Sequence, residues 1–202
     1  MKLYLIRHGE TDWNRLGRIQ GLSDIPLNEA GREQARQLAA GFPAAHPGVK
    51  AVFTSPLSRA RETAEILAGA MGCPVHVLPE ATELSFGDFE GLTWEQAIAL
   101  SEEGYRAGRR AELSDAAPGG ESVYDMLCRI LPTLARAAET LDGDAALVTH
   151  GALIRRTVKF CIPGSGDMRD PALKNGDYRE LPLSAVLDGI KRLEEMRRAF
   201  RR

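Results

Sequence analysis

The chain has 202 residues, of which 44% are hydrophobic, and a formal net charge of −2. This length predicts one domain with a full core, and the near-neutral charge gives no bias toward nucleic acid or a membrane surface. Cys73, Cys128 and Cys161 are far apart and lack CxxC spacing, which disfavours a disulfide framework or a zinc site. The apolar run before Arg7 is too short for a signal peptide, so we expect a cytoplasmic protein without membrane or nucleic-acid partners.

The first predicted element is a short buried strand over residues 1–6 that stops abruptly at Arg7 and His8. Gly9 follows and allows the backbone to turn closely. Residues 11–26 are polar and glycine-containing without a hydrophobic period, which is typical of a functional loop over a strand end. We therefore expect Arg7 and His8 to face a crevice at the edge of a sheet.

Two amphipathic helices with a strand between them are predicted next. The first begins after Asn28, which has the chemistry of an N-cap, and buries one stripe of apolar residues. A β-branched run over residues 49–54 predicts the strand. The second helix starts at Ser55-Pro56 and ends at Gly72, a residue suited to the C′ position.

A short strand at residues 74–78 precedes an irregular segment that carries Glu83 between aromatic residues. Thr93 begins a helix with capping-box spacing that runs to about Gly104. Residues 91–122 are interpreted as a cover segment. This segment contains Arg106, Arg109 and Arg110. These arginines could bind an acidic substrate, but we favour the interpretation that they form a solvent-exposed face.

The last part of the sequence repeats the pattern of the first. A long helix over residues 123–141 contains Pro132, which predicts a kink or two abutting helices. The strand at residues 145–149 then ends at His150-Gly151, just as the first strand ends at His8-Gly9. Two of the four histidines of the chain therefore follow strands.

Three further elements complete the chain. We expect a helix over residues 152–160, a strand over residues 178–187 and a basic amphipathic helix over residues 188–202. For the terminal helix a packed surface role is favoured over membrane or nucleic-acid binding.

This order of elements predicts an α/β fold, a three-layer α/β/α sandwich with a mostly parallel central sheet, as a single domain over residues 1–202. Right-handed crossovers bring the strand ends that carry His8 and His150 to the same edge. Residues distant in the sequence are thereby expected to form one site.

The side chains expected at this edge suit a phosphoryl group. They are Arg7, His8, Asn14, Arg59, Glu83 and His150. Arginine forks match phosphoryl oxygens, and none of these residues shows a metal-site spacing such as HExxH. Fixed positive charge lowers the pKa of a histidine, so His8 is the candidate nucleophile and Glu83 the candidate proton donor. Each residue taken singly also has a structural interpretation. Either histidine could be a strand-end residue bonded to a carbonyl, and Glu83 could be an ordinary loop carboxylate.

These motifs together resemble the histidine phosphatase superfamily, which includes the cofactor-dependent phosphoglycerate mutases. The resemblance runs from Leu5 to about Arg155. It rests on four motifs, Leu5-Ile6-Arg7-His8-Gly9-Glu10-Thr11, Ser55-Pro56-Leu57-Ser58-Arg59-Ala60, Glu83-Leu84 and Val148-Thr149-His150-Gly151. In addition, Pro118-Gly119-Gly120-Glu121-Ser122 is similar to a stretch near the substrate side in smaller members.

The resemblance implies a role for each motif. His8 would become a phosphohistidine, and Glu83 would act as acid and then as base. The phosphate-binding set implied for this chain is Arg7, Asn14, Gln20, Gly21, Arg59, His150 and Gly151. The family pattern needs neither a metal nor another cofactor.

The favoured function is a phosphomonoesterase for a small phosphorylated metabolite, such as α-ribazole phosphate, a sugar phosphate or a broad range of esters. A cofactor-dependent phosphoglycerate mutase is the alternative within the family, although mutases usually carry a larger insert than residues 91–122. A non-catalytic phosphate-binding module is the alternative from another class, and the complete catalytic set argues against it. A homodimer is left open.

Overall fold

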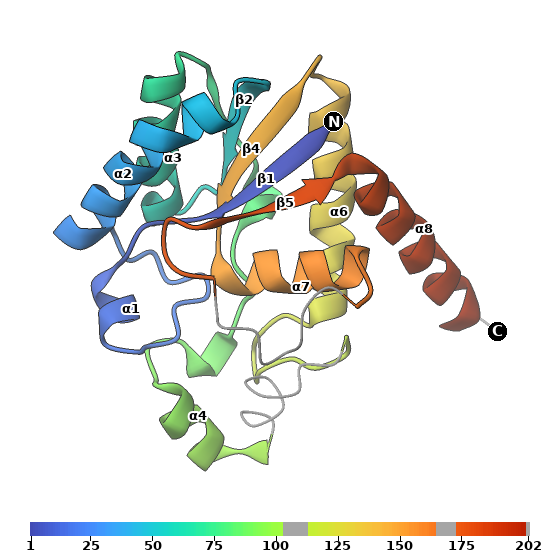
Figure 1. Ribbon diagram of the computed structural model, residues 1–202. Helices are drawn as coiled ribbons and strands as arrows, with labels where there is room; N and C mark the ends of the chain where they lie inside the picture. The colour runs from blue at the N-terminus through green and yellow to red at the C-terminus, as the bar shows by residue number, and fades with distance from the viewer. Residues whose placement is uncertain (103–112, 165–172, 201–202) are drawn as a thin grey trace.

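The computed structural model describes residues 1–102, 113–164 and 173–200, and these form a five-stranded sheet with helices on both faces (Figure 1). The strand order is β3-β2-β4-β1-β5. The strands are β1 (Lys2–Arg7), β2 (Val49–Thr54), β3 (Val75–Val77), β4 (Asp144–Thr149) and β5 (Tyr178–Pro182). Only β5 runs antiparallel among these strands, so the predicted mostly parallel sheet is confirmed.

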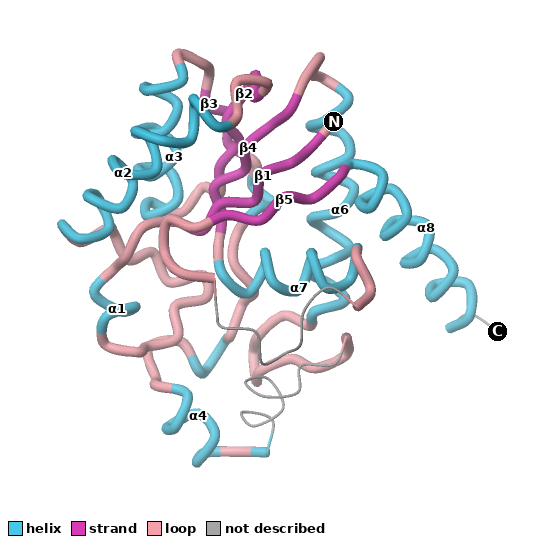
Figure 2. Tube along the Cα trace, in the orientation of Figure 1, coloured by secondary structure: helices cyan, strands magenta, loops and turns pink. Residues whose placement is uncertain are grey.

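The pairing of β1 with β4 places the two histidine motifs side by side. Arg7 lies opposite Thr149 in this parallel pair, and the His8 N–H donates to the Thr149 carbonyl at 3.0 Å. The chain leaves both strands at the same level. The loops that follow these strands lie below the sheet in Figure 2, on the side of the molecule where α1 (Asp12–Arg15), α4 (Trp94–Leu100) and α7 (Gly151–Cys161) lie.

Alternate residues of β1 face two separate apolar layers, as period-two side-chain geometry requires. Leu3 and Leu5 pack into the cluster formed with α6 (Val123–Glu139), α7 and α8 (Leu183–Phe200). Tyr4 and Ile6 pack into the cluster formed with α2 (Glu29–Ala45) and α3 (Ser58–Met71). The predicted three-layer α/β/α sandwich is therefore confirmed.

Several predicted helix ends are borne out by their caps. The Asn28 side chain accepts from Gly31 N–H, Gly72 adopts the left-handed conformation, and Thr93 forms a capping box with Gln96. Helix α3 begins at Ser58 rather than at Ser55-Pro56, and its N-cap Leu57 makes no side-chain capping bond. Helix α4 ends at Leu100.

The structure corrects two predictions about the later helices. Of the two alternatives predicted for Pro132, a kink or two abutting helices, the second is wrong: α6 is one helix through Pro132, and its buried face on both sides of the proline, which includes Ile130 and Leu134, packs into one core. Strand β5 ends at Pro182, and α8 begins at Leu183 instead of residue 188. Val186 and Leu193 lie two helical turns apart on the buried side of α8, and helical packing therefore overrides strand propensity here.

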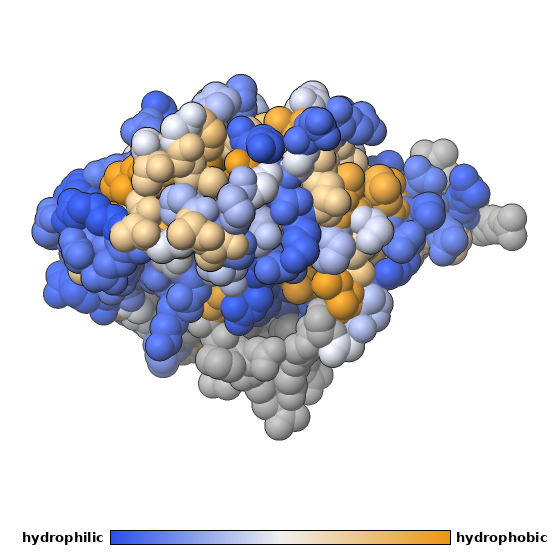
Figure 3. Space-filling model, turned by 45° about the horizontal axis from the view of Figure 1, so that its top comes forward, coloured by the Kyte–Doolittle hydropathy of each residue, from blue (hydrophilic) through white to orange (hydrophobic). Residues whose placement is uncertain are grey.

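Figure 3 shows one face of the molecule, on which hydrophilic side chains alternate with several patches of more hydrophobic ones. Among the helices that the structure describes, we find no span with the length and hydropathy required to cross a bilayer. Residues 103–112, with the three arginines of the predicted cover segment, lie outside the described residues.

The backbone after β1 packs against the start of α2 at two glycines. A Cβ on Gly9 would lie 2.3 Å from the Gly31 carbonyl oxygen, and a Cβ on Gly31 would lie 2.1 Å from the Glu10 carbonyl oxygen. These are distances that only a residue without a side chain tolerates. The loop that carries His8 is thus held directly against α2.

The contact gives a test of the packing. We expect Gly31→Ala to lower the free energy of unfolding by about 1–3 kcal/mol, because its methyl group would overlap backbone atoms. Gly41→Ala is the matched control, since Gly41 lies in the same helix with nothing within 4 Å of its position. Alanine there should be neutral or stabilise by up to about 1 kcal/mol. Urea unfolding measures both changes, and equal stability of the two variants would contradict the packing.

Candidate active site

A cavity of about 290 Å³ opens at the edge of the sheet where β1 and β4 end. It brings together eight residues that the sequence predicts in the site, namely Arg7, His8, Asn14, Gln20, Gly21, Arg59, Glu83 and Gly151. His150 is fully buried and is not part of the lining. Its ring lies beside that of His8, with 5.2 Å between the ring centroids.

His8 has a defined tautomer. Its Nδ1 lies 2.6 Å from the Gly9 carbonyl oxygen, and since a carbonyl only accepts, Nδ1 carries the proton. The lone pair of the neutral ring is therefore on Nε2. Burial lowers the pKa of His8 well below its usual value near 6.5, and the charges of Arg59 and Arg7 lower that pKa further. His8 is accordingly a neutral imidazole with a free basic nitrogen.

Two arginines, the buried Arg59 and the partly buried Arg7, flank this imidazole. The Arg59 guanidinium donates to the carbonyls of Ser23 (2.7 Å) and Gly21 (2.8 Å), while Arg7 Nη1 donates to the Leu173 carbonyl at 2.5 Å. Burial is the largest cause that lowers the pKa of each guanidinium, opposed by the charge of Glu83. Both groups remain cations, and neutral carbonyls hold them in place without cancelling their charge.

Ser55 fixes the orientation of His150. The Ser55 Oγ lies 2.8 Å from His150 Nε2 and accepts from the Leu57 N–H at 3.3 Å. Among the described residues His150 Nε2 is the acceptor within reach of the Ser55 hydroxyl proton, and a buried hydroxyl ordinarily donates, so we assign the proton of His150 to Nδ1. Burial, followed by the charge of Arg59, lowers the pKa of His150 well below its usual value, so this ring is neutral as well.

Three buried polar atoms around His8 have no hydrogen-bond partner among the described residues. They are Arg7 Nε, Arg59 Nε and His150 Nδ1. Buried donors are ordinarily satisfied, because an unpaired one costs about 1–3 kcal/mol. Three such donors around one imidazole fit a bound oxyanion that accepts from all of them.

Glu83 reaches the site from the irregular segment after β3. Its Oε1 accepts from the backbone N–H groups of Leu84 (2.9 Å) and Leu153 (2.8 Å), and its Oε2 accepts from Ala152 N–H at 3.0 Å. The carboxylate thus lies against the N-terminal turn of α7, where unpaired N–H groups and the helix dipole favour an anion. It also lines the cavity.

The loop after β1 closes the other side of the cavity. Asn14 Oδ1 accepts from Asn175 Nδ2 and from the backbone of Thr11, each at 3.2 Å. Gln20 Oε1 accepts from the Thr11 hydroxyl at 3.0 Å. Gly21 has a positive φ of 53°, a conformation that side chains disfavour, and this turn directs its carbonyl to Arg59. The loop therefore both lines the cavity and supports one arginine.

Sequence reasoning missed several residues of the site. Ser55 follows β2 as His150 follows β4, so the same strand-end argument would have found it. Arg155 lines the cavity one helical turn after Gly151, a spacing that places both on one helix face. Arg18 and Trp94 also line it and carried no distinctive signal, whereas Phe86, another lining residue, belongs to the aromatic segment predicted around Glu83. Among the described residues, no group of three or more metal-ligating side chains is present.

Comparison with known proteins agrees with this geometry. Residues 3–182 match the histidine phosphatase superfamily (branch 1). The chain is 34% identical over 190 residues to a probable phosphoglycerate mutase GpmB of Enterobacter sp. (strain 638), covering 90% of this chain and 87% of that protein. It is 36% identical to phosphoglycerate mutase-like protein 4 of Arabidopsis thaliana, covering 81% of this chain and 72% of that protein.

Solved structures show the same likeness. A mycobacterial glucosyl-3-phosphoglycerate phosphatase, solved in complex with VO3, has a TM-score of 0.79 and 30% sequence identity, covering 90% of both chains. The protein TTHB049 from Thermus thermophilus has a TM-score of 0.69 and 34% identity, covering 90% of this chain and 93% of that chain. The resemblance inferred from the motifs is thus confirmed.

The two buried histidines predict how stability depends on pH. Below about pH 6.5 the unfolded chain binds a proton at each histidine, whereas the folded chain does not until far lower pH. The free energy of unfolding should therefore fall with decreasing pH by up to about 1.4 kcal/mol per pH unit for each histidine.

Urea unfolding of wild type and His8→Gln between about pH 6.5 and pH 5 measures how much His8 contributes to the pH dependence of the free energy of unfolding. The variant should lose less stability over this range than the wild type. His76→Gln, which replaces an exposed histidine, is the control. Parallel pH curves for wild type and His8→Gln would contradict the assignment of a neutral, buried His8.

Proposed function

The chain belongs to the histidine phosphatase superfamily (branch 1), and on that premise we propose that it is a metal-independent phosphomonoesterase that forms a phosphohistidine at His8. One observation carries the proposal. The bond from His8 Nδ1 to the Gly9 carbonyl leaves the lone pair on Nε2 of a neutral ring that two arginines flank. A nucleophile of this kind attacks an electrophile that carries negative charge.

In the first half of the proposed reaction, His8 Nε2 attacks phosphorus. The N–P bond forms as the ester P–O bond breaks, in line with the attack. Arg7 Nε, Arg59 Nε and His150 Nδ1, the three unpaired donors, bind the phosphoryl oxygens as their charge redistributes. Protonated Glu83 gives its proton to the leaving oxygen, so the alcohol departs as a neutral molecule.

In the second half, water attacks the phosphohistidine. The Glu83 carboxylate takes a proton from this water as its oxygen bonds to phosphorus, and the N–P bond breaks. Inorganic phosphate is released, His8 returns to its neutral form and Glu83 is protonated again. The same two residues therefore complete both halves without a metal.

Hydrolysis is favoured over mutase chemistry by two observations. The solved phosphatase covers 90% of this chain at a TM-score of 0.79, and residues 91–122 are too few for the larger insert expected of a mutase. The substrate we propose is a small phosphorylated metabolite, with α-ribazole phosphate, a sugar phosphate and a broad range of esters as candidates. The names of the GpmB relatives support phosphoglycerate mutase as the second candidate.

A covalent intermediate gives the most direct test of the chemistry. We expect His8→Ala to lower phosphate release from p-nitrophenyl phosphate by roughly a thousandfold or more, because the nucleophile is lost. Glu83→Gln should accumulate a base-stable, acid-labile phosphoenzyme when rapidly quenched, since the base for hydrolysis is missing. The assays contain EDTA.

His46→Ala, which changes a histidine outside the cavity lining, is the control and should keep wild-type turnover. Near-wild-type turnover by His8→Ala would exclude His8 as nucleophile. Failure of EDTA-treated wild type to release phosphate from any ester would leave the non-catalytic binding module as the better description.

A substrate panel separates hydrolysis from mutase activity. We expect kcat/KM for hydrolysis of the best sugar or nucleoside-like phosphate to exceed the kcat/KM for isomerising 3-phosphoglycerate in the presence of 2,3-bisphosphoglycerate by at least about tenfold. Phosphate release and coupled detection of 2-phosphoglycerate measure the two reactions. Isomerisation faster than every hydrolysis would establish the mutase instead.

A further inference from the structure

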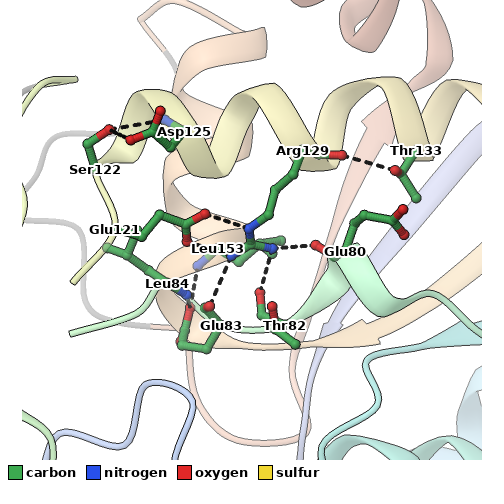
Figure 4. Close-up of polar contacts among 10 residues, drawn as sticks. All are labelled: Glu80, Thr82, Glu83, Leu84, Glu121, Ser122, Asp125, Arg129, Thr133 and Leu153. Carbon is green, nitrogen blue, oxygen red and sulfur yellow. Dashed lines mark hydrogen bonds and ion pairs between the residues drawn. The ribbon is translucent and has the colours of Figure 1, made fainter. Parts of the chain in front are cut away.

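Arg129 contacts the segment that carries Glu83 from the side opposite the cavity. It projects from α6 toward residues 80–83, as Figure 4 shows, and does not line the cavity. Its side chain is only 20% exposed. Neither the motif analysis nor the proposed reaction uses this partly buried cation.

Every N–H group of the Arg129 guanidinium has an acceptor. Nε and Nη2 donate to the two carboxylate oxygens of Glu121 at 2.7 and 2.8 Å, which makes a bidentate ion pair. Nη1 donates to the carbonyls of Glu80 and Thr82, and Nη2 donates also to the Glu83 carbonyl at 3.0 Å. These five bonds use all five donors of an arginine.

The acceptors form a continuous stretch of backbone. Thr149, the residue before His150, donates its hydroxyl to the Ala81 carbonyl at 2.7 Å. Two side chains, those of Arg129 and Thr149, thus donate hydrogen bonds to all four consecutive carbonyls from Glu80 to Glu83. The segment lies outside the sheet, so these side chains replace the ladder that would otherwise hold its backbone.

Glu121 connects this arrangement to the Pro118–Ser122 stretch that the sequence analysis singled out. The Glu121 N–H donates to the Ser85 carbonyl at 3.0 Å, while its carboxylate holds Arg129. The carboxylate of Glu83 is fixed separately, by the N-terminal N–H groups of α7. Glu83 is therefore anchored at its backbone by α6 and at its carboxylate by α7.

We propose that Arg129, held by Glu121, is a positioning residue that sets the location of the Glu83 carboxyl group relative to the scissile ester. The inference rests on the proposed function, since it assigns Arg129 to the proton-transfer step. A lysine keeps the charge but offers neither the planar fork nor five donors, so it leaves backbone carbonyls unpaired. The Glu83 backbone would then lose its fixed position.

Comparing substrates with different leaving groups detects a displaced Glu83 carboxyl group. An alkyl phosphate releases a basic alkoxide and needs the proton from Glu83, whereas p-nitrophenyl phosphate releases a stable anion and does not. The value of kcat/KM covers the steps up to departure of the leaving group. A merely structural defect lowers the active fraction and reduces kcat/KM of both esters equally, but a misplaced Glu83 reduces the alkyl value selectively.

The test compares kcat/KM of Arg129→Lys for p-nitrophenyl phosphate and for glycerol 3-phosphate. We expect the ratio of the aryl to the alkyl value to rise by at least about tenfold over wild type, and Glu83→Gln to show the same pattern. Glu121→Gln should shift the ratio in the same direction by a smaller factor. It provides the measurement if Arg129→Lys fails to fold.

Arg136→Lys is the matched control, because Arg136 lies on the same helix with its side chain 66% exposed. It should leave both kcat/KM values unchanged. An equal fall of both values in Arg129→Lys and Glu121→Gln would overturn the positioning role while the wild-type activity stands. Absence of hydrolysis by the wild type would instead contradict the proposed function itself.

Discussion

Parallel pairing of β1 with β4 is the constraint on which the site depends. In this register Arg7 faces Thr149, so the chain leaves both strands at one level and His8 comes beside His150. Because side chains alternate between faces, a shift by one residue would move Leu5 and Ile6 into the wrong apolar layers. The two cores that flank the sheet thereby lock the relative position of two histidines that lie far apart in the sequence.

A second feature of the site is that its arginine side chains are held in place without being paired to a carboxylate in the described residues. Arg59 is buried and Arg7 is partly buried, yet the hydrogen bonds that their guanidinium groups make to the described residues go to backbone carbonyls. The guanidinium groups are thus oriented but not neutralised. Together with desolvation, their charges keep His8 unprotonated, and their Nε atoms remain available to an anion. In the proposed reaction the bound phosphoryl group offsets the cost of burying these cations.

Glu83 shows how an irregular segment is made rigid. Residues 80–83 belong to no sheet, and their carbonyls are satisfied by Arg129 and Thr149, while α7 binds the Glu83 carboxylate. Elements from both sides of β4 in the sequence therefore fix one side chain. An acid that serves first a leaving group and then a water molecule needs such a defined position.

The sequence by itself determined the strands that end in His8 and His150, the caps at Asn28, Gly72 and Thr93, and the layered α/β fold, because these follow from local periodicity and local hydrogen bonding. Only the tertiary structure decided the tautomer of His8, the contact of Ser55 with His150 and the anchoring of Glu83 by Arg129. It also decided that α6 continues through Pro132 and that α8 begins at Leu183. Ser55 and His150, and likewise Arg129 and Glu83, are distant in the chain, and the tautomer of His8 depends on how the backbone turns at Gly9. Packing rather than local preference selects the course of α6 and α8.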